Sequence, residues 1–413
     1  MRRIPIVLVL VMAASVWPAT NGLANGGVAT NAVAANLQAD FNSDGFADLA
    51  VGVPAENVGG IDNAGAVNVL YGTAAGLTGT GSQLFTQDSP GVGSAAEAGD
   101  LFGLALATGD YNHDGFADLA IGAPGEAVGA IANGGAVNVL YGSASKLTGV
   151  GSQLFTQDSP GVGSAAEAFD FFGTMLAAGD FNHDSLDDLA VGAPFEAVSS
   201  IVDGGAVNVL YGSAGKLTGV GSQLFTQDSP GVGSAAEPGD LFGRALAAGD
   251  FNHDTFADLA VGASGEAVNA VTSAGAVNVL YGSTGKLTGV GSQLFTQDSA
   301  GGSAAEVGDL FGAALAAGDF DNDSFDDMAV GVPHEGVFAI AGAGAVNVLY
   351  GSASKLTGVG SQLFTQDSAE VGSSAEAGDD FGGALAASGP QGATTSPASP
   401  AADSGAQRTA PRR

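Results

Sequence analysis

The sequence of 413 residues contains no cysteine and has few basic residues. Without cysteine the chain forms no disulfide, no thiolate zinc site and no thiol nucleophile. Only 10 Lys and Arg stand against 43 Asp and Glu, which gives a formal net charge of −33. A charge of this size and sign repels the phosphates of nucleic acids and of anionic membranes, so neither is expected as a partner. Glycine is abundant instead, with 68 residues, and the hydrophobic fraction of 45% is enough to build a core.

Long hydrophobic runs are also missing, apart from a short apolar stretch at Ile4–Trp17 that follows Arg2 and Arg3. This pattern predicts a secretory signal peptide over residues 1–24, with an uncleaved membrane anchor as the alternative. We expect a linker at 25–36 and a disordered tail at 389–413, because the tail is rich in Pro, Ala, Ser and Thr and lacks apolar periodicity. The chain is therefore expected to be secreted, extracellular or at the cell surface, with no membrane span after signal cleavage.

An internal repeat dominates the rest of the chain. Near-identical segments begin at five aspartates that lie 70 or 69 residues apart, namely Asp40, Asp110, Asp180, Asp250 and Asp319. A repeat of this length is typical of a propeller blade or a solenoid unit.

Each unit is expected to form four short strands. In the second unit, runs rich in β-branched or aromatic residues, bounded by Gly, Asp, Asn, Ser or Pro, cover 101–108, 116–121, 135–141 and 152–157. Four strands in each unit make one blade, and radially arranged blades make a β-propeller. We therefore predict an all-β propeller of four-stranded blades over residues 37–388, with five blades preferred and six as the alternative.

Closure of the ring can also be predicted from the order of the motifs. An Asp-x-Phe-Gly element lies at the start of the first predicted strand of a blade, and its last copy, which ends at Gly382, has no acidic loop after it. We expect the C-terminal segment to complete the first blade and close the ring, unless residues 33–38 already fill that strand. Closure would remove exposed sheet edges.

Each unit carries a nine-residue acidic loop between its first two predicted strands. Side-chain oxygens occupy positions 1, 3, 5 and 9, and position 7 offers a backbone carbonyl. Calcium binds about six to eight oxygens in flexible geometry, so each loop is predicted to hold one Ca²⁺, up to five in all. The predicted ligands are Asp40, Asn42, Asp44, Phe46, Asp48, Asp110, Asn112, Asp114, Phe116, Asp118, Asp180, Asn182, Asp184, Leu186, Asp188, Asp250, Asn252, Asp254, Phe256, Asp258, Asp319, Asp321, Asp323, Phe325 and Asp327.

Other interpretations of these loops are weaker. An EF-hand needs Glu at position 12, where this chain has Val51 or Ile121, and it is flanked by helices. Magnesium prefers few protein ligands and several waters, and a set of solvated turns without metal is the remaining alternative. Position 6 is Gly in two loops but Ser185, Thr255 and Ser324 in the others, so a turn with positive φ would strain those three and weaken their sites.

Three motifs together resemble the FG-GAP repeat. They are Phe-Gly in the first predicted strand, the acidic loop, and Gly-Ala-Pro after the second strand, as at Gly122–Pro124 and Gly192–Pro194. The third motif drifts to Gly-Val-Pro at Gly52 and Gly331 and to Gly-Ala-Ser at Gly262. Over roughly residues 37–388 the chain is similar to the β-propeller headpiece of integrin α chains and its bacterial secreted relatives. The resemblance implies calcium in the inter-strand loops and a role in extracellular recognition or adhesion; the family usually has seven repeats.

No catalytic constellation stands out, so the sequence favours a binding or adhesion module over an enzyme. The repeated Glu126, Glu196 and Glu266 are expected to be structural, and histidines 113, 183 and 253 to be solvated. The expected partner is an extracellular protein or glycan, bound by a monomer. Segments that differ between units, and so suit specificity, are 129–133, 199–203, 269–273 and 338–342. The alternatives are a propeller hydrolase or lyase with a central carboxylate, and a purely structural surface protein.

Overall fold

The computed structural model describes residues 39–387. The predicted signal peptide, linker and tail lie outside these residues, as does the alternative first strand at 33–38. Among the residues that the structure describes, no helix is long and apolar enough to cross a membrane.

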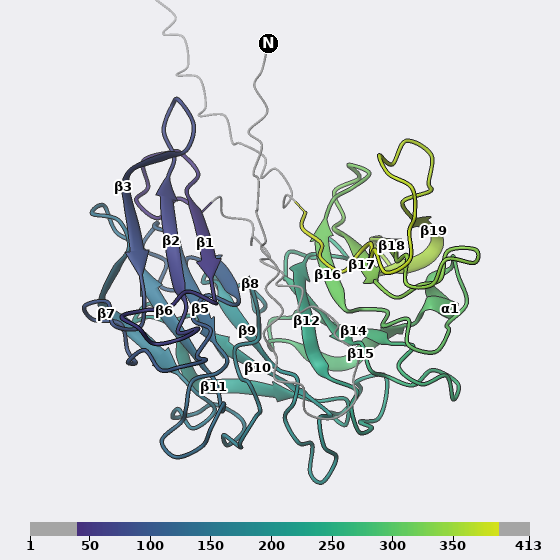
Figure 1. The fold of residues 1–413 in the computed structure, drawn as a ribbon, viewed down its shortest axis with the longest axis horizontal. Helices are drawn as coiled ribbons and strands as arrows, with labels where there is room; N and C mark the ends of the chain where they lie inside the picture. The colour runs from purple at the N-terminus through teal and green to yellow at the C-terminus, as the bar shows by residue number, and fades with distance from the viewer. Residues whose placement is uncertain (1–38, 388–413) are drawn as a thin grey trace, which may run out of the picture.

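Residues 39–387 form five antiparallel sheets, one for each repeat unit (Figure 1). Four sheets have four strands, the first has three, and the strands of each sheet pair in chain order. The prediction of an all-β propeller with five blades is confirmed. The strands of the five blades are, in order, β1 Leu49–Val53, β2 Ala66–Tyr71 and β3 Thr78–Phe85; β4 Leu106–Gly109, β5 Asp118–Ala123, β6 Ala136–Tyr141 and β7 Thr148–Phe155; β8 Met175–Gly179, β9 Asp188–Ala193, β10 Ala206–Tyr211 and β11 Thr218–Phe225; β12 Phe242–Gly249, β13 Asp258–Ala263, β14 Ala276–Tyr281 and β15 Thr288–Phe295; β16 Ala314–Gly318, β17 Asp327–Val332, β18 Ala345–Tyr350 and β19 Thr357–Phe364.

The one helix among the described residues, α1 (Gln297–Ala300), lies where the repeat is one residue shorter. The three preceding units have a proline at this point, as at Pro230, and proline has no N–H to donate. Ala300 replaces it, and its N–H donates to the carbonyl of Thr296 at 2.8 Å, which closes the helical turn.

The Phe-Gly motif ties one blade to the next, and among the described residues only its copy at Phe242 also starts a strand, β12. The N–H of Phe102 donates to the carbonyl of Ala64 in the preceding blade, and that of Gly103 donates to Gly122 in its own blade. Gly65 lies against Phe102 with φ +88°, and a Cβ there would lie 2.3 Å from the Phe102 carbonyl oxygen. Only glycine fits this crossing, which explains its recurrence. It also explains why the first strand of the second blade begins later than predicted, at Leu106.

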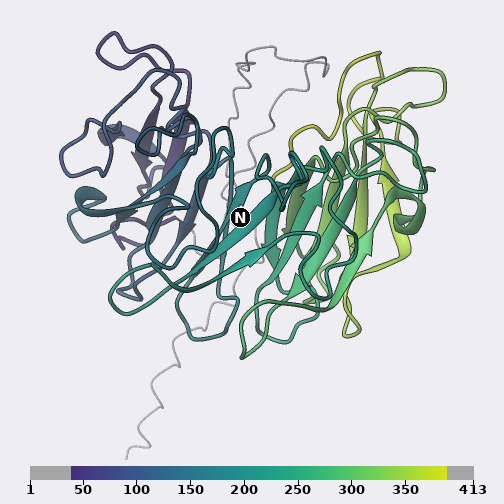
Figure 2. The same cartoon turned by 90° about the horizontal axis from the view of Figure 1, so that it is seen from below.

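The five blades follow one another around an open arc (Figure 1). The first and fifth blades stand at opposite sides of the molecule in both views (Figure 2). The expectation that the C-terminal segment completes the first blade is wrong: Phe381 bridges Gly344 of the fifth unit and packs, with Leu385, on the fifth blade. Phe381 thus contacts the blade that precedes it in the chain, as Phe102 does, and this contact holds the last Phe-Gly copy on the fifth blade.

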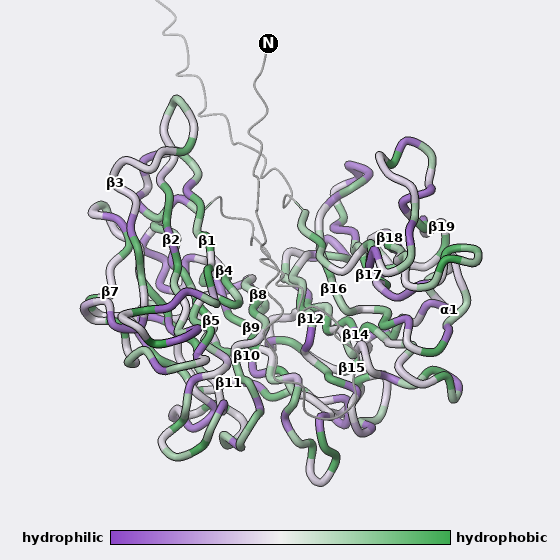
Figure 3. The backbone as a smooth tube through the Cα atoms, in the orientation of Figure 1, coloured by the Kyte–Doolittle hydropathy of each residue, from purple (hydrophilic) through white to green (hydrophobic). Residues whose placement is uncertain are grey.

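The core lies between neighbouring sheets, because the inner strands of a blade bury both faces. In the second blade, Leu119 and Leu140 pack toward the first blade, while Val137 and Val139 pack toward the third. The strands β5 and β6 are accordingly buried along their whole length, and the hydrophobic residues run through the sheets in Figure 3. The strand β1 has a neighbour on one side only among the described residues, and its whole length is partly exposed.

A clasp of three side chains and the backbone of one leucine closes each of the four junctions between blades. At the first junction the ammonium of Lys146 lies 3.8 Å from the centre of the Tyr71 ring and donates to the carbonyl of Gly81 at 2.6 Å. The N–H of Leu147 donates to the Tyr71 hydroxyl, and Gln83 donates to the Leu147 carbonyl at 3.0 Å. The other three lysine–tyrosine pairs are Lys216 with Tyr141, Lys286 with Tyr211, and Lys355 with Tyr281.

Candidate metal centres

The acidic loops lie between the first and second strands of their blades, and their own oxygens fold them. In the second loop the two carboxylate oxygens of Asp110 accept the N–H groups of Asp114 and Gly115, at 3.0 and 2.9 Å. The side-chain oxygen of Asn112 also accepts from Asp114, and an oxygen of Asp114 accepts from Phe116. These bonds turn the backbone around the oxygens of positions 1, 3 and 5. A carboxylate oxygen that accepts one such bond keeps further lone-pair capacity for a cation.

Position 9 anchors each loop to the sheet. Asp118 is fully buried, and its two oxygens accept the N–H groups of Tyr111 at 3.1 Å and Gly142 at 2.9 Å. Burial raises the pKa of Asp118 to about 8, against the opposing effect of these bonds, and nearby Asp114 and Asp110 raise it further. A carboxylate placed in this way is stabilised by a positive charge beside it, which is what a bound cation supplies.

Position 6 adopts positive φ in every loop. The angle is +86° at Gly45 and +82° at Gly115, and also +70° at Ser185, +78° at Thr255 and +78° at Ser324. The last three residues carry a Cβ in a conformation that glycine reaches without steric cost, so their loops are strained.

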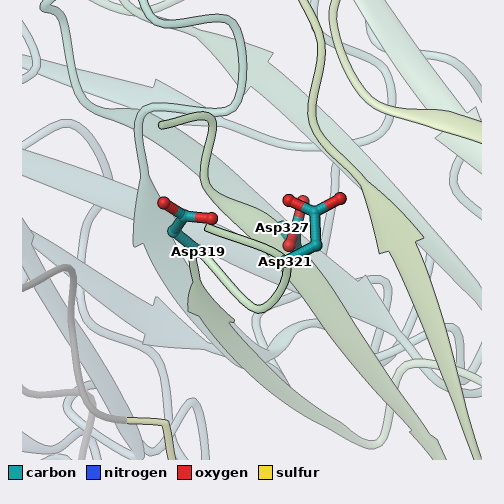
Figure 4. Close-up of side chains that lie close together, drawn as sticks. All are labelled: Asp319, Asp321 and Asp327. Carbon is teal, nitrogen blue, oxygen red and sulfur yellow. The ribbon is translucent and has the colours of Figure 1, made fainter. Parts of the chain in front are cut away.

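The fifth loop gathers three carboxylates (Figure 4). Oxygens of Asp319, Asp321 and Asp327 all lie within 4.8 Å of one another. Ligands around one Ca²⁺ lie about 2.3–2.6 Å from it, so two of its ligand oxygens are at most about 5 Å apart. This spacing fits a single calcium ion, and a donor set made only of oxygens suits a hard cation.

The other four described loops form no such group of three acids, because Asn stands at position 3 where the fifth loop has Asp321. Their predicted ligands at positions 1, 3, 5 and 9 nevertheless share the loop hydrogen bonds described above, as in the first loop around Asp40 and Asp48. Asp323 lies outside the converging group of the fifth loop.

Two acids at position 8 were not among the predicted site residues. Asp187 and Asp326 replace the alanine of the other loops, and each accepts an N–H at 2.8 Å from position 1 of the preceding blade, Asp110 and Asp250 respectively. Burial raises the pKa of both carboxyls to about 6. The signal was present as a departure from the repeat, but only the structure shows that position 8 faces the neighbouring blade.

The histidines at position 4 are less isolated than expected. The rings of His183 and His253 lie 5.4 and 5.6 Å from those of Phe256 and Phe325 in the next blade. The Nδ1 atom of His183 also lies 2.8 Å from the carbonyl oxygen of Thr255. These contacts belong to the junctions between blades.

The repeated glutamates hold the link between blades. Glu126 is buried, and its Oε2 accepts a hydrogen bond from Gln87, which comes from the preceding unit and also donates to Ser94. Burial raises the pKa of Glu126 to about 7, and Asp100 adds to the effect. The geometry agrees with the structural role expected for these residues.

Comparison with known proteins places the repeats in a family. The FG-GAP repeat matches residues 32–70, 102–140, 172–210, 242–280 and 311–349, one match for each blade. The chain is therefore an FG-GAP repeat protein with an integrin-α-like propeller, as the motifs predict.

The chain is similar to parts of larger proteins. The phosphatidylinositol-glycan-specific phospholipase D of Bos taurus is 36% identical over 162 residues, which is 39% of this chain and 18% of the relative. Integrin alpha-PS5 of Drosophila melanogaster is 33% identical over 175 residues, which is 41% of this chain and 15% of the relative. This chain thus spans less than a fifth of either protein. Among solved structures, the rhamnogalacturonan lyase YesW aligns with a TM-score of 0.36 at 13% identity, over 71% of this chain and 58% of that one.

The expectation that the chain is not an enzyme is contradicted by these relatives, since one of them is by name a phospholipase D. The sequence argument rested on the absence of a recognisable catalytic constellation, and such an absence does not exclude catalysis.

Proposed function

We propose that this protein is a secreted propeller that binds calcium in its five acidic loops and acts as an extracellular binding module. The observation that carries the proposal is the convergence of Asp319, Asp321 and Asp327 in a loop that the chain repeats in every blade. The kinship with integrin α chains supports the binding role. A cleaved signal peptide at 1–24 and a free tail at 389–413 belong to the same proposal.

The partner would meet the propeller at the turns that differ between units. Phe338 lies at the tip of one such turn, where the other units have Gly59, Gly129, Ser199 or Asn269. Its side chain is 95% exposed and its φ is +57°. A fully exposed aromatic in a left-handed conformation costs stability and buries nothing in the fold, so it points to an outside contact with a protein or glycan.

The test is capture of the partner from the native extracellular medium by the immobilised mature chain. We expect capture with calcium, loss of capture with a chelator, and weaker capture by Phe338→Ser. Val220→Ser is the matched control, because Val220 is also exposed but lies on the outer strand β11. Equal capture with and without calcium contradicts the proposal, and hydrolysis of a phosphatidylinositol glycan by the pure chain would favour the activity named for the phospholipase relatives instead.

A further inference from the structure

The arc ends in two faces that are buried at every internal junction. On the first blade Leu77 is 50% exposed, whereas its counterparts Leu147, Leu217, Leu287 and Leu356 are each 2% exposed. On the fifth blade Phe320 is 43% exposed, whereas its counterparts Phe41, Tyr111, Phe181 and Phe251 are fully buried. We call these the head face, around Leu77 on the first blade, and the tail face, around Phe320 and Tyr350 on the fifth.

The two faces are the two halves of one junction. At each junction within the chain, one blade presents a tyrosine and the loop carbonyls. The next blade packs against them with the face that carries its leucine. At the first junction the carbonyls of Asp40 and Phe41 accept N–H groups of Ala117 and Ser143, at 3.2 and 3.1 Å. The tail face repeats the accepting half, with Asp319, Phe320 and Tyr350, and no later blade follows it within residues 39–387. The head face repeats the donating half.

We propose that the tail face of one molecule binds the head face of a second copy, so that the protein assembles head to tail. The interface would continue a contact that the chain already makes four times, with the same residue types in the same places. A second copy is favoured over the molecule's own head face because the first and fifth blades, which carry the two faces, stand at opposite sides of the molecule (Figures 1 and 2). A contact of this heterologous kind does not stop at two copies.

One position makes the contact weaker than an internal junction. Gly76 occupies the place of the clasp lysines 146, 216, 286 and 355, so the head face has no ammonium to lay over Tyr350. Gly76 already has φ +105°, within the range of +80° to +114° that those lysines adopt, and a Cβ there meets nothing within 4 Å. Lysine therefore fits at this position. The high negative charge of the chain also opposes association, so the contact should strengthen with ionic strength.

The first experiment measures mass against concentration for the mature chain by sedimentation and light scattering, with calcium and at raised ionic strength. We expect species larger than a dimer at high concentration. Gly76→Lys should tighten association roughly threefold to tenfold, by adding a cation–π contact and a hydrogen bond. Tyr350→Ala should cancel that gain in the double variant. Val220→Glu, on an exposed outer strand away from both faces, should leave association unchanged.

The second experiment uses two blocked variants. Leu77→Glu should weaken association at least about tenfold, because it places a charge in an apolar contact. Leu77→Glu and Tyr350→Ala should each remain monomeric alone, yet form a one-to-one dimer when mixed. The proposal is overturned if the parent is a monomer at all concentrations and Gly76→Lys is a monomer too. It is also overturned if Gly76→Lys stays monomeric but becomes more compact, since the two faces would then meet within one molecule. Calcium-dependent capture of a partner is unaffected by either result, so the proposed function is judged separately.

Discussion

Ser185, Thr255 and Ser324 hold a backbone conformation that Gly45 and Gly115 adopt at the same place in their loops. A residue with a Cβ in this region costs about 1–2 kcal/mol relative to a right-handed conformation. The loops of Gly115 and Thr255 otherwise differ only at position 2, Tyr111 against Phe251, so exchange of the position 6 residue between these two loops isolates the cost.

Thr255→Gly should therefore raise the free energy of unfolding by about 1 kcal/mol, because the strain is relieved and part of the gain is lost to the greater freedom of glycine in the unfolded chain. The reciprocal Gly115→Thr should lower it by a similar amount, since a Cβ at Gly115 meets nothing within 4 Å and only φ opposes it. Urea denaturation with saturating calcium measures both. Changes of the same sign in the two variants would contradict the strain argument.

Glu126 gives a pH-dependent test at the same scale. Its pKa is raised by burial to about 7, above the ordinary value of 4.5 that it regains on unfolding. The folded state therefore holds a proton that the unfolded chain releases, and this contribution to stability is lost as pH rises through about 7. Glu126→Gln, which stays neutral, should match the parent near pH 5 and exceed its stability by about 1 kcal/mol near pH 8, a figure that allows for solvent screening.

The measurement is the difference in unfolding free energy between variant and parent across this range, with calcium saturating so that the acidic loops cancel. Glu56→Gln is the matched control, because Glu56 is the equivalent residue of the first unit and is exposed. A difference that grows toward low pH would reverse the sign and refute the assignment.

At the scale of strands and blades, the tyrosine clasp explains how near-identical sheets hold together. The hydroxyl of Tyr141 donates to Gln153 and accepts the N–H of Leu217 at 3.2 Å. Tyr141→Phe keeps the ring under Lys216 but leaves a buried N–H without its acceptor, so it should cost about 1–3 kcal/mol of unfolding free energy.

Tyr350→Phe is the control for this prediction. Tyr350 also donates to its glutamine, Gln362, but no leucine of a following blade meets it in the described part of the chain. At concentrations where the chain is monomeric, removal of the Tyr350 hydroxyl should lower the free energy of unfolding by much less than removal of the Tyr141 hydroxyl. Equal costs would show that the bond between blades contributes nothing.

The strands themselves could be predicted because β6 alternates Val137, Val139 and Tyr141 with Ala136 and Leu140, a pattern that follows from burial on both faces. Their ends could not. Phe116 reads as strand but belongs to the acidic loop, whose hydrogen bonds hold its backbone. The register shift between Val139 and Tyr141 leaves no trace in the pattern.

Whether the ring of blades closes could not be predicted from the sequence, for a different reason. The angle between neighbouring blades depends on the packing of whole sheets, and small differences add up around the arc. One local sign was nevertheless present, since the first unit has Gly76 where every later unit has a clasp lysine. Of the site, the sequence supplied the ligand types and their spacing, while the burial of Asp118 and the contact of Asp187 with the preceding blade come from the fold.

At the scale of the whole molecule, calcium should decide thermal stability. Each occupied loop stabilises the folded state by about 2.7 kcal/mol when free calcium is about a hundred times the Kd. With up to five loops, a chelator should lower Tm by roughly 10 °C or more. Differential scanning calorimetry of the mature chain checks this, with magnesium at the same concentration as the control that should restore less. If the chelator does not change the Tm, the prediction of stabilising calcium in the five loops is wrong.

The near-identity of the units has a consequence for how the chain reaches this arc. A blade contacts mainly its immediate neighbours, and those neighbours are almost interchangeable, since stretches such as 149–158 recur in other units with few changes. During folding, the second unit can therefore dock on the fourth with the third looped out, and nearly every contact of a proper junction forms. Such an off-by-one assembly is a kinetic trap that must open before the full arc can form, as is characteristic of repeat proteins. Refolding from denaturant should accordingly show slow phases that synthesis from the N-terminus avoids, because the third unit folds before the fourth exists.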